Sequence, residues 1–115
     1  MTTSPTPTQI TLHKISKTLE IEFDSGERFC LPCEYLRVFS PSAEVRGQGN
    51  PQLVLGKENV TILSIEPVGH YAVTLLFSDG HRTGIYSWDT LYELGKHQAH
   101  HWQTYLEKVK WIKNH

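Results

Sequence analysis

The chain has few cysteines and almost no net charge. It has 115 residues, with two cysteines, 11 Lys and Arg, and 12 Asp and Glu. A domain of this length buries about two-thirds of its unfolded surface, so neither disulfides nor a metal is needed for folding. Because the charges nearly balance, the chain has no overall field that attracts nucleic acid or an anionic membrane surface. We therefore expect neither nucleic acid nor a membrane as a partner.

Long apolar runs and nucleotide-binding loops are also absent from the sequence. No apolar run approaches the ~20 residues of a membrane span. The N-terminal MTTSPTPTQ has neither the basic nor the apolar region of a secretion signal. There is no glycine-rich loop of the dinucleotide or P-loop type, and there are no repeats or heptads. We therefore expect a cytoplasmic protein, in which a pair of cysteines is more often reduced than bonded.

The first third of the chain predicts a hairpin followed by a short helix. Residues 1–8 are mostly Thr, Ser and Pro and are predicted to form a disordered tail, before a single domain over residues 9–115. Apolar and polar residues alternate on both sides of the turn sequence DSGE, which predicts a hairpin over residues 18–31. Pro32 has no N–H for a strand ladder and suits the first turn of a helix.

The remainder predicts more strands and then helices. Residues 40–57 are rich in Gly and Pro and predict a long connection. The segments NVTILSIEP, YAVTLLF and RTGIYSW predict strands, and the second is apolar enough to be central in a sheet. Ser87 or Asp89 is expected to cap a helix that stops at Gly95. A last helix carries an apolar stripe in which Trp102 and Leu106 are expected to anchor it.

These elements predict an α+β fold. We expect an antiparallel, meander-like sheet of five or six strands, with a short helix after the first hairpin and helices at the C-terminus. A doubly wound parallel sheet is disfavoured, since helices and strands do not alternate.

The two cysteines form a CLPC motif, Cys30 and Cys33. This spacing is used by redox dithiols and by half of many zinc sites. Strand alternation points Cys30 outward, and Cys33 falls at a helix N-terminus, where the pKa of a thiol is often lowered. No second Cys pair exists to complete a zinc site. We interpret the motif as two ordinary small side chains, with a redox or metal role as the alternative.

Three histidines lie at the start of the last predicted helix. His97 and His101 are four residues apart, so they share a helix face and are placed to chelate a divalent metal, while His100 lies beside them. Two such ligands bind weakly without a third ligand and supporting contacts. We interpret this cluster as a solvated helix start.

The segments LEIEFDSGERFCLPCEYLRVFSPSAE, IEPVGHYAVTLLFSDGHRTGIYSW and LYELG carry a resemblance. In combination they resemble the gamma-butyrobetaine hydroxylase-like N-terminal domain family, over about residues 9–105. The large two-domain dioxygenases with a related domain bind a structural zinc through three cysteines and one histidine. The matching positions here are Ser40, Ser42, Val45 and His81, so only His81 is a zinc ligand by type. The resemblance therefore implies neither that zinc site nor hydroxylase activity.

The resemblance also implies a set of site residues and a partner. Similar domains occur fused to Mrp-type P-loop ATPases with iron–sulfur clusters, which suggests an accessory role in iron handling. The family pattern brings a polar set together near the long connection: Arg37, Ser40, Ser42, Glu44, Asp79, His81 and Arg82.

Three hypotheses for the function follow. The first is a non-catalytic adaptor that uses this polar set to bind a protein of the iron–sulfur carrier machinery or a small anionic ligand, with no cofactor. The alternative is a metal-binding protein that holds iron or zinc through His81 with carboxylates, or through Cys30 and Cys33. An enzyme is the weakest hypothesis, because no catalytic constellation is recognisable. The adaptor hypothesis makes a geometric prediction, namely that the His81 ring lies within hydrogen-bonding or one-water distance of residues 37–44.

Overall fold

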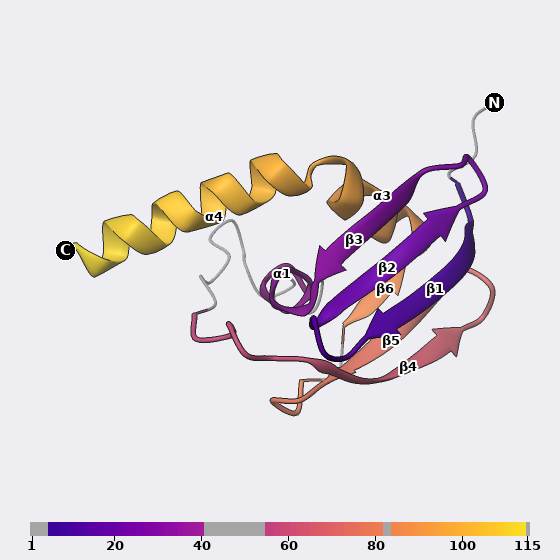
Figure 1. The fold of residues 1–115 in the computed structure, drawn as a ribbon, viewed down its shortest axis with the longest axis horizontal. Helices are drawn as coiled ribbons and strands as arrows, with labels where there is room; N and C mark the ends of the chain where they lie inside the picture. The colour runs from indigo at the N-terminus through magenta and orange to yellow at the C-terminus, as the bar shows by residue number, and fades with distance from the viewer. Residues whose placement is uncertain (1–4, 41–54, 82–83, 115) are drawn as a thin grey trace.

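The computed structural model describes residues 5–40, 55–81 and 84–114. In chain order the elements are β1 (Pro7–His13), β2 (Thr18–Phe23), β3 (Arg28–Pro32), α1 (Cys33–Val38), β4 (Ile62–Val68), β5 (Ala72–Phe77), β6 (Ile85–Ser87), α3 (Trp88–Lys96) and α4 (Gln98–Lys113). The predicted hairpin, short helix and C-terminal helices are present. Figure 1 shows their arrangement.

The six strands of the described residues form two sheets rather than one. Their orders are β1-β2-β3 and β4-β5-β6, and every neighbouring pair is antiparallel. The expected antiparallel pairing and α+β class are confirmed, and the prediction that all the strands form a single sheet is wrong. Each sheet has one apolar face, and the two faces contribute to one core cluster. Two short sheets therefore bury their apolar faces against each other, which a single flat sheet cannot do.

The alternating strand β2 shows how the sequence builds this core. Leu19, Ile21 and Phe23 are buried, and the residues between them lie towards the surface. The apolar strand β5 is central in its sheet, as predicted. Strand β1 begins at Pro7 rather than near Gln9, because its pairing with β2 extends to the end of that strand.

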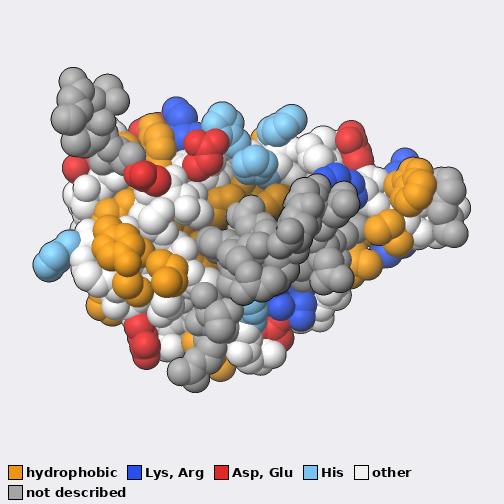
Figure 2. Space-filling view, turned by 180° about the vertical axis from the view of Figure 1, so that it is seen from behind, with side chains coloured by type: hydrophobic (Ala, Val, Ile, Leu, Met, Phe, Trp, Pro, Cys, Tyr) orange, Lys and Arg blue, Asp and Glu red, His pale blue; other side chains and the backbone are white. Residues whose placement is uncertain are grey.

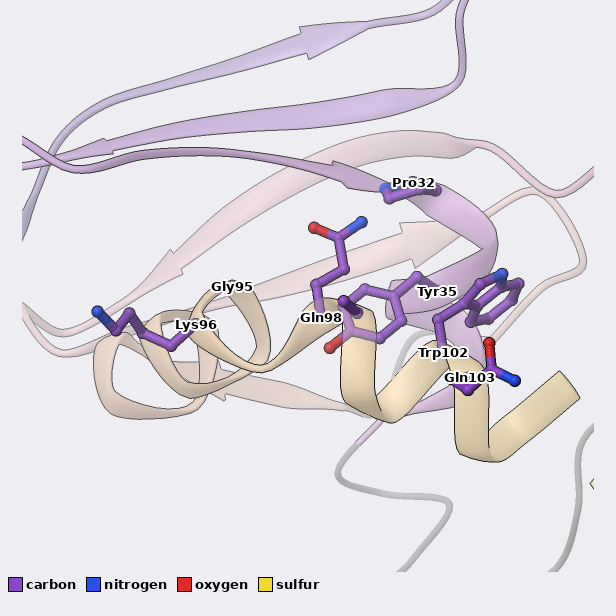
Figure 3. Close-up of a pocket in the computed structure, with 8 residues that line it drawn as sticks. Pro32, Tyr35, Gly95, Lys96, Gln98, Trp102 and Gln103 are labelled. Carbon is purple, nitrogen blue, oxygen red and sulfur yellow. The ribbon is translucent and has the colours of Figure 1, made fainter. Parts of the chain in front are cut away.

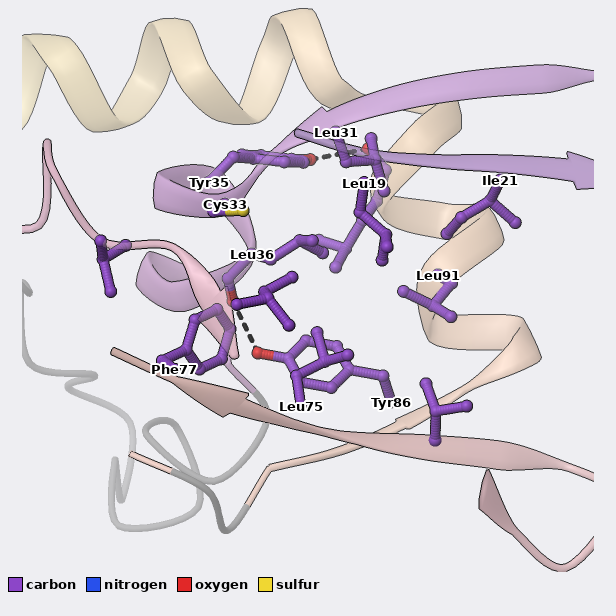
Figure 4. Packing of buried hydrophobic residues seen from close by; sticks show 14 of the residues in the cluster. Leu19, Ile21, Leu31, Cys33, Tyr35, Leu36, Leu75, Phe77, Tyr86 and Leu91 are labelled. Atoms are coloured by element: carbon purple, nitrogen blue, oxygen red, sulfur yellow. Dashed lines mark hydrogen bonds between the residues drawn. The ribbon is translucent and has the colours of Figure 1, made fainter. Parts of the chain in front are cut away.

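Two buried tyrosines fix the position of α1. The hydroxyl of Tyr35 donates to the carbonyl oxygen of Leu94 at 2.7 Å, and the hydroxyl of Tyr86 donates to that of Leu36 at 2.7 Å. Figure 4 shows both bonds within the packed core. Burial raises the pKa of both phenols, so they stay neutral donors. The first bond ties α1 to the end of α3, and the second ties it to β6.

Helix α3 begins as predicted and ends one residue later. The hydroxyl of Ser87 accepts from the N–H of Thr90 at 3.1 Å, which is a helix N-cap. Gly95 lies inside the helix rather than after it, since α3 continues to Lys96. The ring of Phe29 packs so closely on Gly95 that a Cβ there would lie 2.5 Å from ring atoms. Gly95 is therefore a packing glycine rather than a helix stop.

Helix α4 docks through its first turns only, and its C-terminal half projects beyond the sheets (Figure 1). Tyr105 is buried, and the ring of Trp102 stacks on it with centroids 4.8 Å apart. Leu106 is 46% exposed, so its predicted role as an anchor is wrong. The apolar stripe of α4 therefore extends beyond the part of the helix that packs against the rest of the domain.

Candidate functional site

Three charged side chains from separate segments meet at the turn after β5. Asp79 Oδ2 lies 2.8 Å from Nε of Arg37, on α1, and 2.7 Å from Nζ of Lys57, which precedes β4. The side chains of Arg37, Asp79 and Lys57 are 12%, 22% and 23% exposed. They are therefore partly desolvated, which strengthens the pairs over ordinary surface ion pairs.

The sequence SDGH makes this turn by local chemistry. Asp79 Oδ1 accepts from the N–H of His81 at 3.1 Å, and the N–H of Gly80 donates to the carbonyl oxygen of Phe77 at 2.9 Å. Gly80 has φ +92°, which a residue with a side chain rarely adopts. The turn therefore holds the Asp79 carboxylate and the His81 ring on the same side of the domain as α1.

The ring of His81 contacts the end of α1. Its Nε2 atom lies 2.9 Å from Oγ of Ser40, a residue that is almost fully buried. The predicted proximity of His81 to residues 37–44 is thus confirmed. The structure therefore joins five residues in one cluster: Arg37, Ser40, Lys57, Asp79 and His81.

Electrostatics make this cluster a net positive site. Burial alone would raise the pKa of Asp79, but hydrogen bonds from Lys57, the His81 N–H and Arg37 outweigh it and hold that pKa well below its usual range. Burial lowers the pKa of His81, and the charge of Arg37 lowers it further against the opposing effect of Asp79. At pH 7 two cations and a neutral imidazole therefore surround one carboxylate. The arrangement has the donors and charge to bind an anionic group.

Three residues of the predicted set, Ser42, Glu44 and Arg82, lie outside the described residues. The two cysteines are free thiols that differ in burial. Cys30 is exposed on β3 and Cys33 is buried. Burial raises the pKa of the Cys33 thiol, which opposes the lowering expected at a helix N-terminus.

Within residues 5–40, 55–81 and 84–114, no three His, Cys, Asp or Glu side chains are arranged to hold a metal ion. In the helix-start cluster, Nε2 of His97 lies 3.2 Å from Oε1 of Glu93, and the rings of His97 and His101 are 6.0 Å apart. Burial and the neighbouring histidines lower the pKa of His101.

Sequence reasoning missed Lys57. It completes the charged cluster from 22 positions away in the chain. It follows Gly56 in the long connection, and no periodic pattern links that connection to the SDGH turn. The only available signal was a lone lysine just before a predicted strand.

A separate groove of ≈ 470 Å³ lies between α1 and the start of α4 (Figure 3). Tyr35 and Trp102 provide its aromatic side chains, and Gln98 and Gln103 provide amides. The amine of Lys96, at its rim, lies 3.1 Å from Oε2 of Glu27. The predicted site residues that the structure describes do not line this groove.

Across the described parts of the chain, no helix is long and apolar enough to span a membrane.

Comparisons with known proteins agree with this fold. A model of the family described as gamma-butyrobetaine hydroxylase-like, N-terminal, matches residues 10–92. One structure solved by NMR is 52% identical, with TM-score 0.85, and the match covers 98% of this chain and 88% of the other. A second NMR structure is 46% identical, with TM-score 0.82, over 94% of this chain and 86% of the other.

A crystal structure gives a third comparison. The crystallised protein comes from Acidithiobacillus ferrooxidans, has an unknown function and belongs to the DUF971 family. It is 43% identical, with TM-score 0.68, over 77% of this chain and 91% of the other. Among curated proteins, no sequence matches this chain. The family match covers more than half of the residues, and the chain therefore belongs to the gamma-butyrobetaine hydroxylase-like N-terminal family.

Proposed function

We propose that the protein is a cytoplasmic, non-catalytic adaptor that binds an acidic segment of a partner protein at the cluster of Arg37, Lys57, Asp79 and His81. The observation that carries this proposal is the charge balance of the cluster, in which two partly buried cations share one carboxylate. Arg37 reaches Asp79 through Nε. The terminal amino groups of its guanidinium are the donors that we assign to the carboxylate of the partner.

The rigidity of the cluster supports binding rather than simple solvation. The second carboxylate oxygen of Asp79 is held by a backbone N–H, and the ring of His81 is held by a buried hydroxyl. Side chains fixed in this way lose little conformational freedom when a ligand binds. We assign the adaptor to iron or iron–sulfur handling because similar domains accompany iron–sulfur ATPases.

Affinity capture with matched variants tests the proposal. Lys57→Gln removes one cation from the cluster, while Lys96→Gln removes a lysine that is paired with a carboxylate elsewhere. We expect quantitative mass spectrometry of captured proteins to show a partner that is lost with Lys57→Gln and retained with Lys96→Gln. A partner set that responds equally to both variants would contradict the proposal.

Metal analysis separates the adaptor from the metal-binding alternative. The untagged protein is expected to contain less than stoichiometric zinc or iron, because His81 lacks the thiolates of the related zinc site. Stoichiometric metal that disappears in His81→Ala, with the fold intact by circular dichroism, would establish the alternative instead.

A further inference from the structure

The C-terminal half of α4 carries apolar side chains that are largely exposed. Leu106 and Ile112 are 46% and 43% exposed, and Val109 is half-buried between them. We call these three residues the α4 stripe. Figure 2 shows hydrophobic side chains gathered towards the end of the projecting helix. The stripe lies on the same helix face as Trp102 and Tyr105, which pack against the body of the domain. This apolar face therefore continues beyond the part of the domain that it packs against.

Basic side chains border the α4 stripe. Lys110 follows Leu106 by four residues, Lys113 follows Val109 by four, and Lys108 precedes Ile112 by four. Residues at this spacing are neighbours on a helix surface. All three lysines are exposed. The stripe is therefore an apolar row with positive charge on its flanks.

We propose that the α4 stripe is the docking site for an acidic amphipathic helix of a partner protein. Apolar side chains of that helix would cover Leu106, Val109 and Ile112, and its carboxylates would lie beside the lysines. This surface is separate from the cluster at Asp79. The proposal therefore stands independently of the proposed function.

Two other occupants fit the surface less well. A second copy paired through the same face would bring lysines against lysines, which is repulsive across a symmetric interface. A lipid surface favours a helix whose whole apolar face is open. Here the first turns of that face are already docked through Tyr105, and only about two turns remain.

The test is an NMR titration of the ¹⁵N-labelled full chain with a synthetic helix-forming peptide that has leucine on one face and glutamate on the other. A peptide with lysine in place of glutamate is the charge control. We expect shifts concentrated on residues 102–113, and affinity for the acidic peptide at least about tenfold above that for the basic one. Shifts at Arg37, Asp79 and His81 alone would overturn this proposal and leave the proposed function standing.

Matched variants connect the binding to the stripe. Ile112→Asp and the double change Lys110→Glu with Lys113→Glu should each weaken binding at least about tenfold. Ile15→Asp and Lys14→Glu lie in the turn after β1, where Ile15 is 99% exposed, and should leave the affinity unchanged. Circular dichroism checks the fold of each variant.

Three results would overturn the proposal. They are equal binding of both peptides, self-association in sedimentation velocity that Ile112→Asp abolishes, and co-sedimentation with phosphatidylserine vesicles that the same variant abolishes. The first would indicate apolar contact without charge recognition. The others would assign the stripe to a second copy or to a lipid surface.

Discussion

Alanine at Gly95 is expected to destabilise the fold, although alanine is the better helix former. A Cβ at this position would lie 2.5 Å from two ring atoms of Phe29, closer than real Cβ contacts. The ring of Phe29 has little room to turn away. It meets the rings of Phe23 and Tyr92 edge-on, with centroids 5.8 Å and 5.9 Å apart. The strain therefore falls on the contact between β3 and α3.

Two opposing contributions set the effect of Gly95→Ala on the free energy of unfolding. Overpacking of a well-filled core costs about 1–3 kcal/mol. Replacing glycine by alanine inside a helix returns about 1 kcal/mol. We expect Gly95→Ala to lower the free energy of unfolding by up to about 2 kcal/mol, measured by urea denaturation followed by circular dichroism.

A double-mutant cycle makes this prediction sharp. In a Phe29→Ala background the ring is gone, so Gly95→Ala should be neutral or stabilise by up to about 1 kcal/mol. Gly95→Ala should therefore destabilise the wild type but not the Phe29→Ala variant. A stabilising effect in the wild type, or equal effects in both backgrounds, would refute the assigned packing role of Gly95.

Further predictions concern α4, the cysteines and pH. Tyr105→Ala should lower the free energy of unfolding by about 3 kcal/mol, and Leu106→Ala, at an exposed position, should lower it by under about 1 kcal/mol. Equal losses in the two variants would contradict the docking of α4 through its first turns only. Cys33→Ala should lower the free energy of unfolding by about 1–2 kcal/mol, because it leaves a cavity, and Cys30→Ala should lower it by under about 0.5 kcal/mol. Loss of folding in the double variant together with loss of bound metal would instead support a metal role for the two cysteines. Burial lowers the pKa of His81 in the folded state below the value of about 6.5 in the unfolded chain. The stabilisation by neutral His81 is therefore complete above about pH 6.5, and it is lost as the pH falls from that value through the folded pKa. Urea midpoints should thus fall more steeply below about pH 7 for the wild type than for His81→Gln, and parallel curves would exclude this linkage.

Local patterns predicted the local structure. The alternation around DSGE gave the β2–β3 hairpin, and Pro32 gave the start of α1, because both depend on neighbouring residues only. The outward direction of Cys30 followed from the same alternation. The contact between His81 and Ser40 was predicted from the family resemblance rather than from any periodicity.

Long-range packing decided the rest. The division into two sheets depends on how the apolar faces of β2 and β5 meet, and the strand patterns are the same in one sheet or two. The stripe on α4 shows which side chains share a face, but it does not show where the body of the domain ends. Leu106 was misassigned for that reason. Lys57 joins Asp79 through a tertiary contact that leaves no local signal.

We propose above that the cluster of Arg37, Lys57, Asp79 and His81 binds an acidic partner. Isothermal titration calorimetry of the captured partner against the wild type, Lys57→Gln and Lys96→Gln tests it most directly. We expect Lys57→Gln to weaken binding at least about tenfold, about 1.4 kcal/mol, and Lys96→Gln to leave the dissociation constant unchanged. The same dissociation constant for all three proteins would contradict it.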